Sequence, residues 1–140
     1  MRIPDSARAV LESKALGHLV TLNPDGSPQV SVIWVGLDGD EVVAGHLPNN
    51  RKVKNIRRDG RVVLSIETDT VNPSGLTEYL VITGTARITE GGAAELLRKL
   101  AKTYLGPDVP FLPSDDVPPG YVTHISVEKI GGVGPWSVPG

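Results

Sequence analysis

The chain has 140 residues, which is enough for one domain with a sizeable core but not for two. Its 14 basic and 16 acidic residues give a net charge of −2, so no global field attracts nucleic acid or an anionic membrane. The absence of cysteine excludes disulfides, thiolate metal ligands and a cysteine nucleophile.

The first half of the chain predicts a short helix followed by an antiparallel meander. Residues 5–14 have Asp5 or Ser6 as a possible cap and apolar residues on one face, which is typical of a helix. Three strand-like runs follow at residues 17–22, 28–37 and 41–46. The sequences Asn-Pro-Asp-Gly at 23–26 and Asp-Gly-Asp at 38–40 are turn signals, so these runs should form hairpins.

A second short helix is predicted after the third strand. Asn49 or Asn50 is a good N-cap, because a short polar side chain can accept from the free N–H groups of the first turn. Val53 and Ile56 then fall on one face, and the other face is polar. The helix should therefore pack on the sheet through these two residues.

The second half of the chain predicts three more strands and a third helix. The strands cover residues 61–68, 78–89 and 121–130, and the amphipathic helix covers 93–104. An isolated glycine in a strand suggests a bulge or a barrel bend, so Gly84 should mark one. Residues 106–120 hold five prolines and form a loop long enough to indicate a function or a partner contact.

These elements predict a single domain over residues 1–140, ending in a Gly/Pro-rich tail at 131–140. Six strands with closely spaced turns and about three flanking helices indicate a mainly β fold, a closed or split antiparallel barrel. No apolar run approaches the roughly 20 residues of a membrane span. Residues 1–6 also lack the apolar core of a signal peptide. We therefore expect a cytoplasmic protein that binds neither membrane nor nucleic acid.

Two cations at the start of the second predicted helix indicate an anion site. Arg51 and Lys52 lie where the helix dipole is already positive, which is unfavourable unless an anion joins them. Free N–H groups together with an Arg and a Lys suit a phosphate. Asn55 lies one turn further on and could hold a second oxygen. A solvated basic helix end is the alternative, but the position directly after a strand favours the anion site.

No catalytic residue can be identified from the sequence. The histidines His18, His46 and His124 lack metal-type spacing, so we expect no metal site; each is best interpreted as a surface or locally hydrogen-bonded residue, and His46 deserves notice because it lies just before the anion site. There is also no serine-triad, Walker or Gly-rich dinucleotide motif. A phosphate site without an acid or base indicates that a bound cofactor supplies the chemistry.

Three further side chains have two interpretations each. Ser31 could hydrogen-bond a ligand or be a surface serine of the sheet. Trp34 is expected in the core or in a dimer interface. Trp136 lies in a tail too short to form a core element, so it should dock on a neighbouring subunit or on a ligand ring.

Several segments of the chain together resemble one known family. Residues 17–30 combine a strand, an Asp-Gly turn and a proline, and Trp34 and Val35 follow on the next strand. Residues 50–52, Asn-Arg-Lys, resemble a Ser-Arg-Lys phosphate motif, and residues 52–61 resemble a Lys-x-x-Asn-Leu-Arg-Arg-Asp-Pro-Arg run. These features resemble the pyridoxamine-phosphate-oxidase-like split-barrel flavoproteins, and more closely their branch dependent on the deazaflavin F420.

The resemblance implies a homodimer with two cofactor sites at the subunit interface. It implies that the phosphate or acidic tail of the cofactor contacts Asn50, Arg51, Lys52 and Asn55. It also implies that the ring system lies along the second and third strands. The residues expected there are Gln29, Ser31, Val32, Trp34, Ala44, Gly45 and His46, and Trp136 is expected to add an aromatic contact.

Three departures from the family pattern limit the activity. Gly60 replaces the usual proline, Asn50 stands where the oxidases use serine, and the C-terminal Arg-x-His pattern of true pyridoxamine-phosphate oxidases is absent. The resemblance therefore implies an F420-dependent oxidoreductase that passes a hydride between F420 and a small conjugated substrate. The alternatives are an enzyme or binding protein for flavin mononucleotide (FMN), and a non-enzymatic module that binds a tetrapyrrole or a similar ligand.

Overall fold

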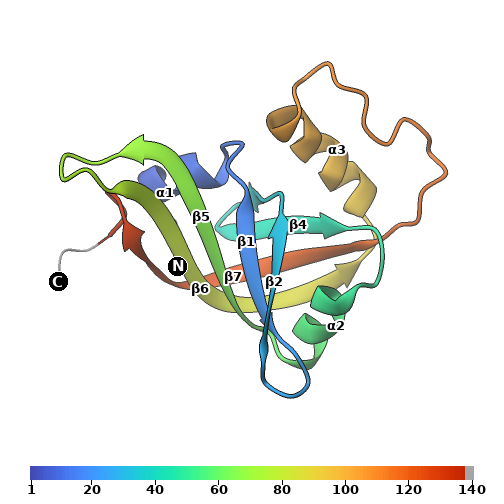
Figure 1. Cartoon of the computed structure of the whole chain (residues 1–140). Coiled ribbons are helices and arrows are strands. Elements are labelled where there is room, and N and C mark those ends of the chain that lie inside the picture. The colour runs from blue at the N-terminus through green and yellow to red at the C-terminus, as the bar shows by residue number, and fades with distance from the viewer. Residues whose placement is uncertain (138–140) are drawn as a thin grey trace.

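A computed structural model describes residues 1–137, and the last three residues of the expected tail lie outside the described residues. Seven antiparallel strands form one sheet with the order β2-β1-β5-β6-β7-β4-β3 (Figure 1). The strands are β1 (Gly17–Leu22), β2 (Pro28–Ile33), β3 (Gly36–Asp38), β4 (Glu41–His46), β5 (Arg61–Val71), β6 (Thr77–Glu90) and β7 (Tyr121–Val133). The helices are α1 (Asp5–Leu11), α2 (Arg51–Arg58) and α3 (Ala93–Tyr104). The predicted mainly β architecture with three helices is confirmed.

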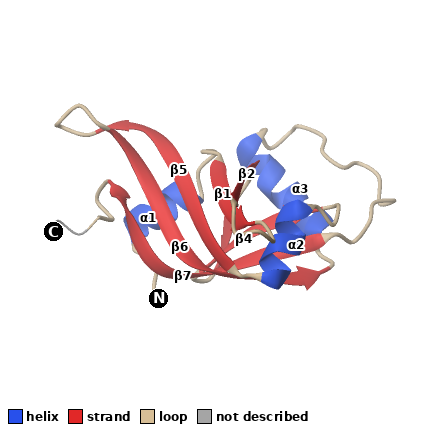
Figure 2. Ribbon diagram, turned by 60° about the horizontal axis from the view of Figure 1, so that its bottom comes forward, coloured by secondary structure: helices blue, strands red, loops and turns tan. Residues whose placement is uncertain are grey.

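The sheet curls around an aliphatic core, as the scarcity of aromatic residues requires. The long strands β5, β6 and β7 bend together, with α1 near one end and α2 and α3 toward the other (Figures 1 and 2). Burying the aliphatic side chains of this core supplies most of the free energy that stabilises the fold, at about 25 cal/mol per Å² of apolar surface. The largest fully buried aliphatic side chains on the strands are Leu19, Val42, Leu64, Ile66, Leu80, Ile82 and Ile125.

The bulge predicted at Gly84 is confirmed. The β6–β7 register shifts between Thr83 and Gly84, so that Thr83 pairs with Lys129 while Gly84 pairs with Val127. A Cβ atom at position 84 would lie 2.2 Å from the Ser126 carbonyl oxygen, far inside contact distance. Only glycine permits this close approach of the two strands, and the bulge bends the sheet.

Several boundaries differ from the sequence prediction. The run expected as one strand over residues 28–37 breaks into β2 and β3, because Val35 leaves the ladder and its N–H donates to the Tyr104 hydroxyl at 3.0 Å. The paired strands β5 and β6 extend to Val71 and from Thr77, beyond the expected ends. The N-cap of α1 is Pro4, with no side-chain cap from Asp5 or Ser6, and the helix ends at Leu11.

Two glycines let α3 sit directly on the strands. A Cβ atom at Gly36 would lie 2.8 Å from Leu100 Cδ2, and one at Gly45 would lie 3.0 Å from Leu97 Cγ. Larger residues at these positions would push the helix away from β3 and β4. This close seating brings the end of α3, and the loop that follows it, to the end of β2.

Candidate functional site on helix α2

Asn50 begins α2 as predicted. Its side-chain oxygen accepts from the Val53 N–H at 3.3 Å, while Val53 and Ile56 are buried beneath the helix. The first turn contains no acidic residue. The helix therefore starts with free N–H groups and cations, the arrangement that favours an anion.

Asn55 is turned into the protein and not toward the helix start. It is 1% exposed, and its amide nitrogen donates to Thr21 Oγ1 at 3.0 Å and to Asn23 Oδ1 at 3.1 Å. Its oxygen accepts from Arg58 at 3.2 Å. The amide thus ties α2 to the β1–β2 hairpin, beside which the helix lies in Figure 1. Contact between Asn55 and a cofactor oxygen stays a prediction, and its observed role is to hold the helix in place.

A basic hollow lies between α2 and the turn of that hairpin. It has a volume of about 430 Å³ and is lined by Pro24, Arg51, Lys54, Asn55 and Arg58. Three of these are cations at positions i, i+3 and i+7, so they share one helix face. Within residues 1–137 no carboxylate forms an ion pair with them. Sequence reasoning missed Lys54 and Arg58, although their helical spacing from Arg51 was a readable signal.

Asp25 is the acidic side chain on this turn that feels the charge of Arg51. Its pKa lies below the usual range, chiefly because Ser27 hydrogen-bonds it, and Arg51 contributes least. Asp25 is therefore satisfied by its own turn and forms no ion pair with Arg51, while Arg58 already donates to the Leu22 carbonyl and to the Asn55 oxygen.

Lys52 lies on another flank of α2, where its charge acts on His46. It is half-buried, and burial lowers its pKa. His46 is 4% exposed and its Nε2 lies 2.7 Å from Thr123 Oγ1. Burial, followed by the positive charge of Lys52, lowers the pKa of His46 to about 4. With this lowered pKa, His46 is expected to be neutral at pH 7, and its Nε2 is paired with the Thr123 hydroxyl.

The expected ring-contact residues of β2 are divided between its two faces. Val30 and Val32 point outward and are 60% and 57% exposed. Gln29 and Ser31 point to the other face, and Gln29 Oε1 accepts from Thr21 Oγ1 at 3.2 Å. On this strand, the exposed surface that a flat ring could cover is the valine pair.

The expected residues of β4 offer no exposed side chain. Ala44 belongs to the core cluster, Gly45 lies under Leu97 of α3, and His46 is buried. Contact between these three residues and a cofactor ring stays a prediction.

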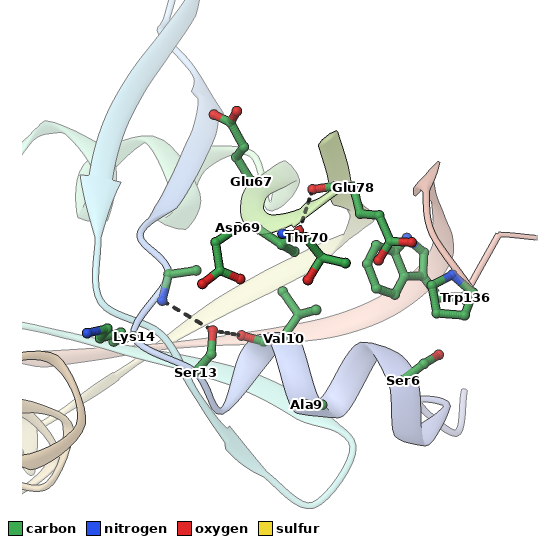
Figure 3. Close-up of a pocket in the computed structure, with 13 residues that line it drawn as sticks. Ser6, Ala9, Val10, Ser13, Lys14, Glu67, Asp69, Thr70, Glu78 and Trp136 are labelled. Carbon is green, nitrogen blue, oxygen red and sulfur yellow. Dashed lines mark hydrogen bonds between the residues drawn. The ribbon is translucent and has the colours of Figure 1, made fainter. Parts of the chain in front are cut away.

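Trp136 docks on its own chain. It is 7% exposed, belongs to the core cluster and borders a cavity of about 710 Å³ formed by α1, the ends of β5 and β6, and Pro135 (Figure 3). Its Nε1–H is buried without a hydrogen-bond partner. This cavity lies at the opposite end of the long strands from α2, so within one chain Trp136 does not border the basic hollow (Figure 2).

The remaining candidates are accounted for locally. His18 is exposed, and His124 Nε2 lies 2.9 Å from Thr89 Oγ1, as expected for locally bonded histidines. In the described part of the chain, no group of three or more His, Asp or Glu residues could hold a metal ion. No helix among residues 1–137 is long and apolar enough to cross a membrane.

Comparison with known proteins identifies the fold. The family model described as "Pyridoxamine 5'-phosphate oxidase" matches residues 3–134. A solved F420 reductase is 26% identical, with a TM-score of 0.73 over 92% of this chain and 98% of that one.

Two further solved structures share the fold. A heme binding protein from Mycobacterium smegmatis is 22% identical, with a TM-score of 0.64 over 91% of this chain and 52% of that one. A FAD-binding protein from Mesorhizobium loti is 19% identical, with a TM-score of 0.60 over 89% and 88%. At these identities the likeness shows the fold alone.

Proposed function

Because the chain belongs to the pyridoxamine 5'-phosphate oxidase family, with the split-barrel fold predicted from its sequence, we propose that it is an F420-dependent reductase. It transfers a hydride from reduced F420 to a small conjugated substrate, which takes the accompanying proton from solvent. The likeness to an F420 reductase supports this proposal. Its main structural basis is the presence of cations on two flanks of α2.

The cations on α2 exceed what a single phosphate needs. Asn50 and Lys52 stand at the helix start, while Arg51, Lys54 and Arg58 line the separate hollow beside the hairpin turn. FMN presents one phosphate, whereas F420 carries a phosphate and an acidic tail. A ligand with several anionic groups can engage both flanks at once, and each charge-assisted hydrogen bond adds affinity.

The residues around α2 bind and orient a cofactor without themselves moving protons. His46 is neutral and buried, and Lys52 supplies positive charge in a half-buried position where Coulombic attraction is less screened. When bound, reduced F420 supplies a hydride from one ring carbon. The role of the chain is to fix the acidic groups and to leave one face of the ring open.

We further propose that two copies of the chain complete the site. Val30 and Val32 form an exposed apolar pair on the edge strand β2, and exposing such a pair to water is unfavourable. The cavity beside Trp136 is bordered by this aromatic side chain, whose indole N–H is buried without a partner. In a homodimer this cavity and the β2 face of the partner can enclose one ring, which gives Trp136 the ligand contact expected from the sequence.

An FMN-dependent enzyme of the same fold is the second candidate. One phosphate could be bound at the start of α2 alone, by the free N–H groups, the Asn50 cap and Lys52. Binding there without any contact to the basic hollow would favour FMN. In that case Lys54 and Arg58 would contribute nothing to cofactor affinity.

An activity measurement tests the proposal. Purified protein is mixed with chemically reduced F420 and a planar quinone, and reoxidation of the deazaflavin is followed by its absorbance. We expect turnover that depends on protein and quinone, and a background rate with reduced FMN. Turnover with FMN alone would favour the second candidate, and inactivity with both would overturn the oxidoreductase proposal.

A further inference from the structure

The Pro-rich loop at residues 106–120 is bound at its C-terminal end, where the Pro119 and Gly120 carbonyls accept from Ala93 and Gly91, and its middle is held through Arg98. Arg98 of α3 donates from Nε to the Leu112 carbonyl at 3.0 Å and from a terminal nitrogen to the Ser114 carbonyl at 2.9 Å. Most of the other side chains in this loop are exposed. In Figure 1 the loop arches away from the end of α3 before it joins β7. Arg98 thus holds this loop, residues 106–120, which we call the strap and which has few buried side chains.

Phe111 of this strap covers Trp34. The two ring centroids are 5.3 Å apart and the planes are tilted by 51°. On Trp34 there is also a second aromatic contact, since Tyr104 stacks on it at 5.3 Å with an interplanar angle of 11°. Aromatic pairs at such separations contribute about 0.5–1.5 kcal/mol beyond their buried area. Trp34 is therefore covered by two aromatic neighbours.

The two aromatic neighbours of Trp34 differ in how firmly they are held. The Tyr104 hydroxyl donates to the Ala15 carbonyl at 3.0 Å and accepts from the Val35 N–H at 3.0 Å, so this ring is fixed to the sheet. Phe111 has no polar side-chain atom, so its position over Trp34 depends on the strap that carries it. Opening the strap would therefore uncover Trp34 while leaving Tyr104 stacked.

The closed strap contains a strained residue. Leu112 has φ of +47°, and among residues 1–137 it is the one residue other than glycine with a positive φ. This conformation costs about 1–2 kcal/mol for a residue with a Cβ atom. Its neighbour Phe111 and the two Arg98 hydrogen bonds offset this cost, so loss of either contact is expected to release the strap.

The strap covers Trp34, so the position of Trp34 indicates what the strap could control. Trp34 follows directly after β2, two residues beyond the exposed Val32. We propose that residues 106–120 are a gate, and that opening this gate frees one face of Trp34 to stack a planar, conjugated acceptor. The identity of the acceptor as a hydride substrate rests on the proposed function, whereas gating and planar-ligand binding at Trp34 do not.

The opening can be measured on Trp34 itself. Trp136→Phe leaves Trp34 as the sole tryptophan, and phenylalanine suits position 136 because the indole N–H has no partner. In this background Arg98→Met removes both hydrogen bonds but keeps the aliphatic stem, and Lys99→Met on the same helix is the matched control. We expect acrylamide quenching of Trp34 to rise at least threefold in Arg98→Met and to stay unchanged in the control. Equal quenching in all three proteins would overturn the gate.

Ligand stacking is tested with 2-methyl-1,4-naphthoquinone as the planar probe, titrated by the quenching of Trp34 emission without any cofactor. Phe111→Ala raises the fraction of open gate, so the apparent Kd should fall three- to tenfold. Pro110→Ala, on the same strap, should leave it unchanged. An unaltered or weaker Kd in Phe111→Ala would overturn the inference. If Phe111→Ala binds the naphthoquinone more tightly but the protein does not bind F420, the gate is supported and only the proposed function is contradicted.

Discussion

The amide of Asn55, buried in α2, donates a 3.0 Å hydrogen bond to the hydroxyl of Thr21 in β1. This bond joins the basic helix to the hairpin whose turn forms the other wall of the hollow. The oxygen of the Asn55 amide accepts from Arg58, so Asn55 also fixes the orientation of one of the three cations of the hollow. The positions of these charges therefore depend on a buried polar network.

Asn55→Leu should destabilise the protein by roughly 1–3 kcal/mol, because the buried hydroxyl of Thr21 loses a hydrogen-bond partner and Arg58 loses the oxygen that orients it. Urea unfolding measures this change. Asn49→Leu, at an exposed position just before the helix, is the control and should stay within about 0.5 kcal/mol. Equal effects of the two substitutions would contradict the network.

The bulge between β6 and β7, where Glu128 of β7 is left out of the register opposite Gly84, gives a prediction about the barrel. Gly84→Ala places a Cβ atom 2.2 Å from the Ser126 carbonyl oxygen, so the strands must separate, at a cost of about 1–3 kcal/mol. Gly131→Ala in β7 is the matched control, because a Cβ atom there meets nothing within 4 Å. Thermal unfolding compares the two proteins. A larger loss in Gly131→Ala would show that the strand approach is not as described.

His46 predicts a pH dependence of stability. Its pKa falls from about 6.5 in the unfolded chain to about 4 in the folded one, through burial and then the charge of Lys52. As the pH falls from about 6.5 toward 4, the unfolded chain takes up a proton that the folded chain refuses. Folding stability should therefore be full above pH 6.5 and decline below it, by at most about 3 kcal/mol.

Unfolding free energies of the wild type and His46→Asn, measured between pH 4 and 7, isolate this effect from the titration of other groups. His124, whose pKa is lowered by burial and by Arg87, acts in the same direction in both proteins. The difference between the two proteins should shrink as the pH falls, since asparagine does not titrate. A difference independent of pH would contradict the assignment.

The hollow predicts that Lys54→Ala discriminates between cofactors. The substitution removes one cation from the site proposed for the acidic tail, so F420 should bind about threefold to tenfold more weakly while FMN affinity stays the same. Lys102→Ala, on the exposed face of α3, is the control for net charge. The discrimination should weaken as salt is raised, because exposed charges are screened. Equal losses for both cofactors would place the phosphate itself in the hollow.

Local signals in the sequence predicted most of the fold. β1, β4 and α3 have the expected bounds, because turn residues flank the strands and the apolar residues of α3 repeat at helical spacing. Asn50 caps α2 as expected, and Gly84 marks a bulge. In each case the decisive interaction is made with residues nearby in sequence or is forced by the lack of a Cβ atom.

The differences arise from contacts between residues distant in sequence. Val35 leaves its strand because the hydroxyl of Tyr104, 69 residues away, binds its backbone. Asn55 turns inward because Thr21 and Asn23 offer partners that no local pattern reveals. Trp136 finds its docking place on the core of its own chain. Helix periodicity alone could have added Lys54 and Arg58 to the site, whereas the burial of Ala44 and His46 required the fold.

Side-by-side equilibrium titration with F420 and with FMN, on the wild type and on Lys52→Ala, decides whether α2 holds the acidic groups of F420. We expect the wild type to bind F420 more tightly than FMN. Under this proposal Lys52→Ala should lose about 1.5–3 kcal/mol of F420 binding, the scale of a hydrogen bond to a charged group, with an unchanged circular dichroism spectrum. Unaltered F420 affinity in Lys52→Ala, or no binding of either cofactor to the wild type, would contradict it.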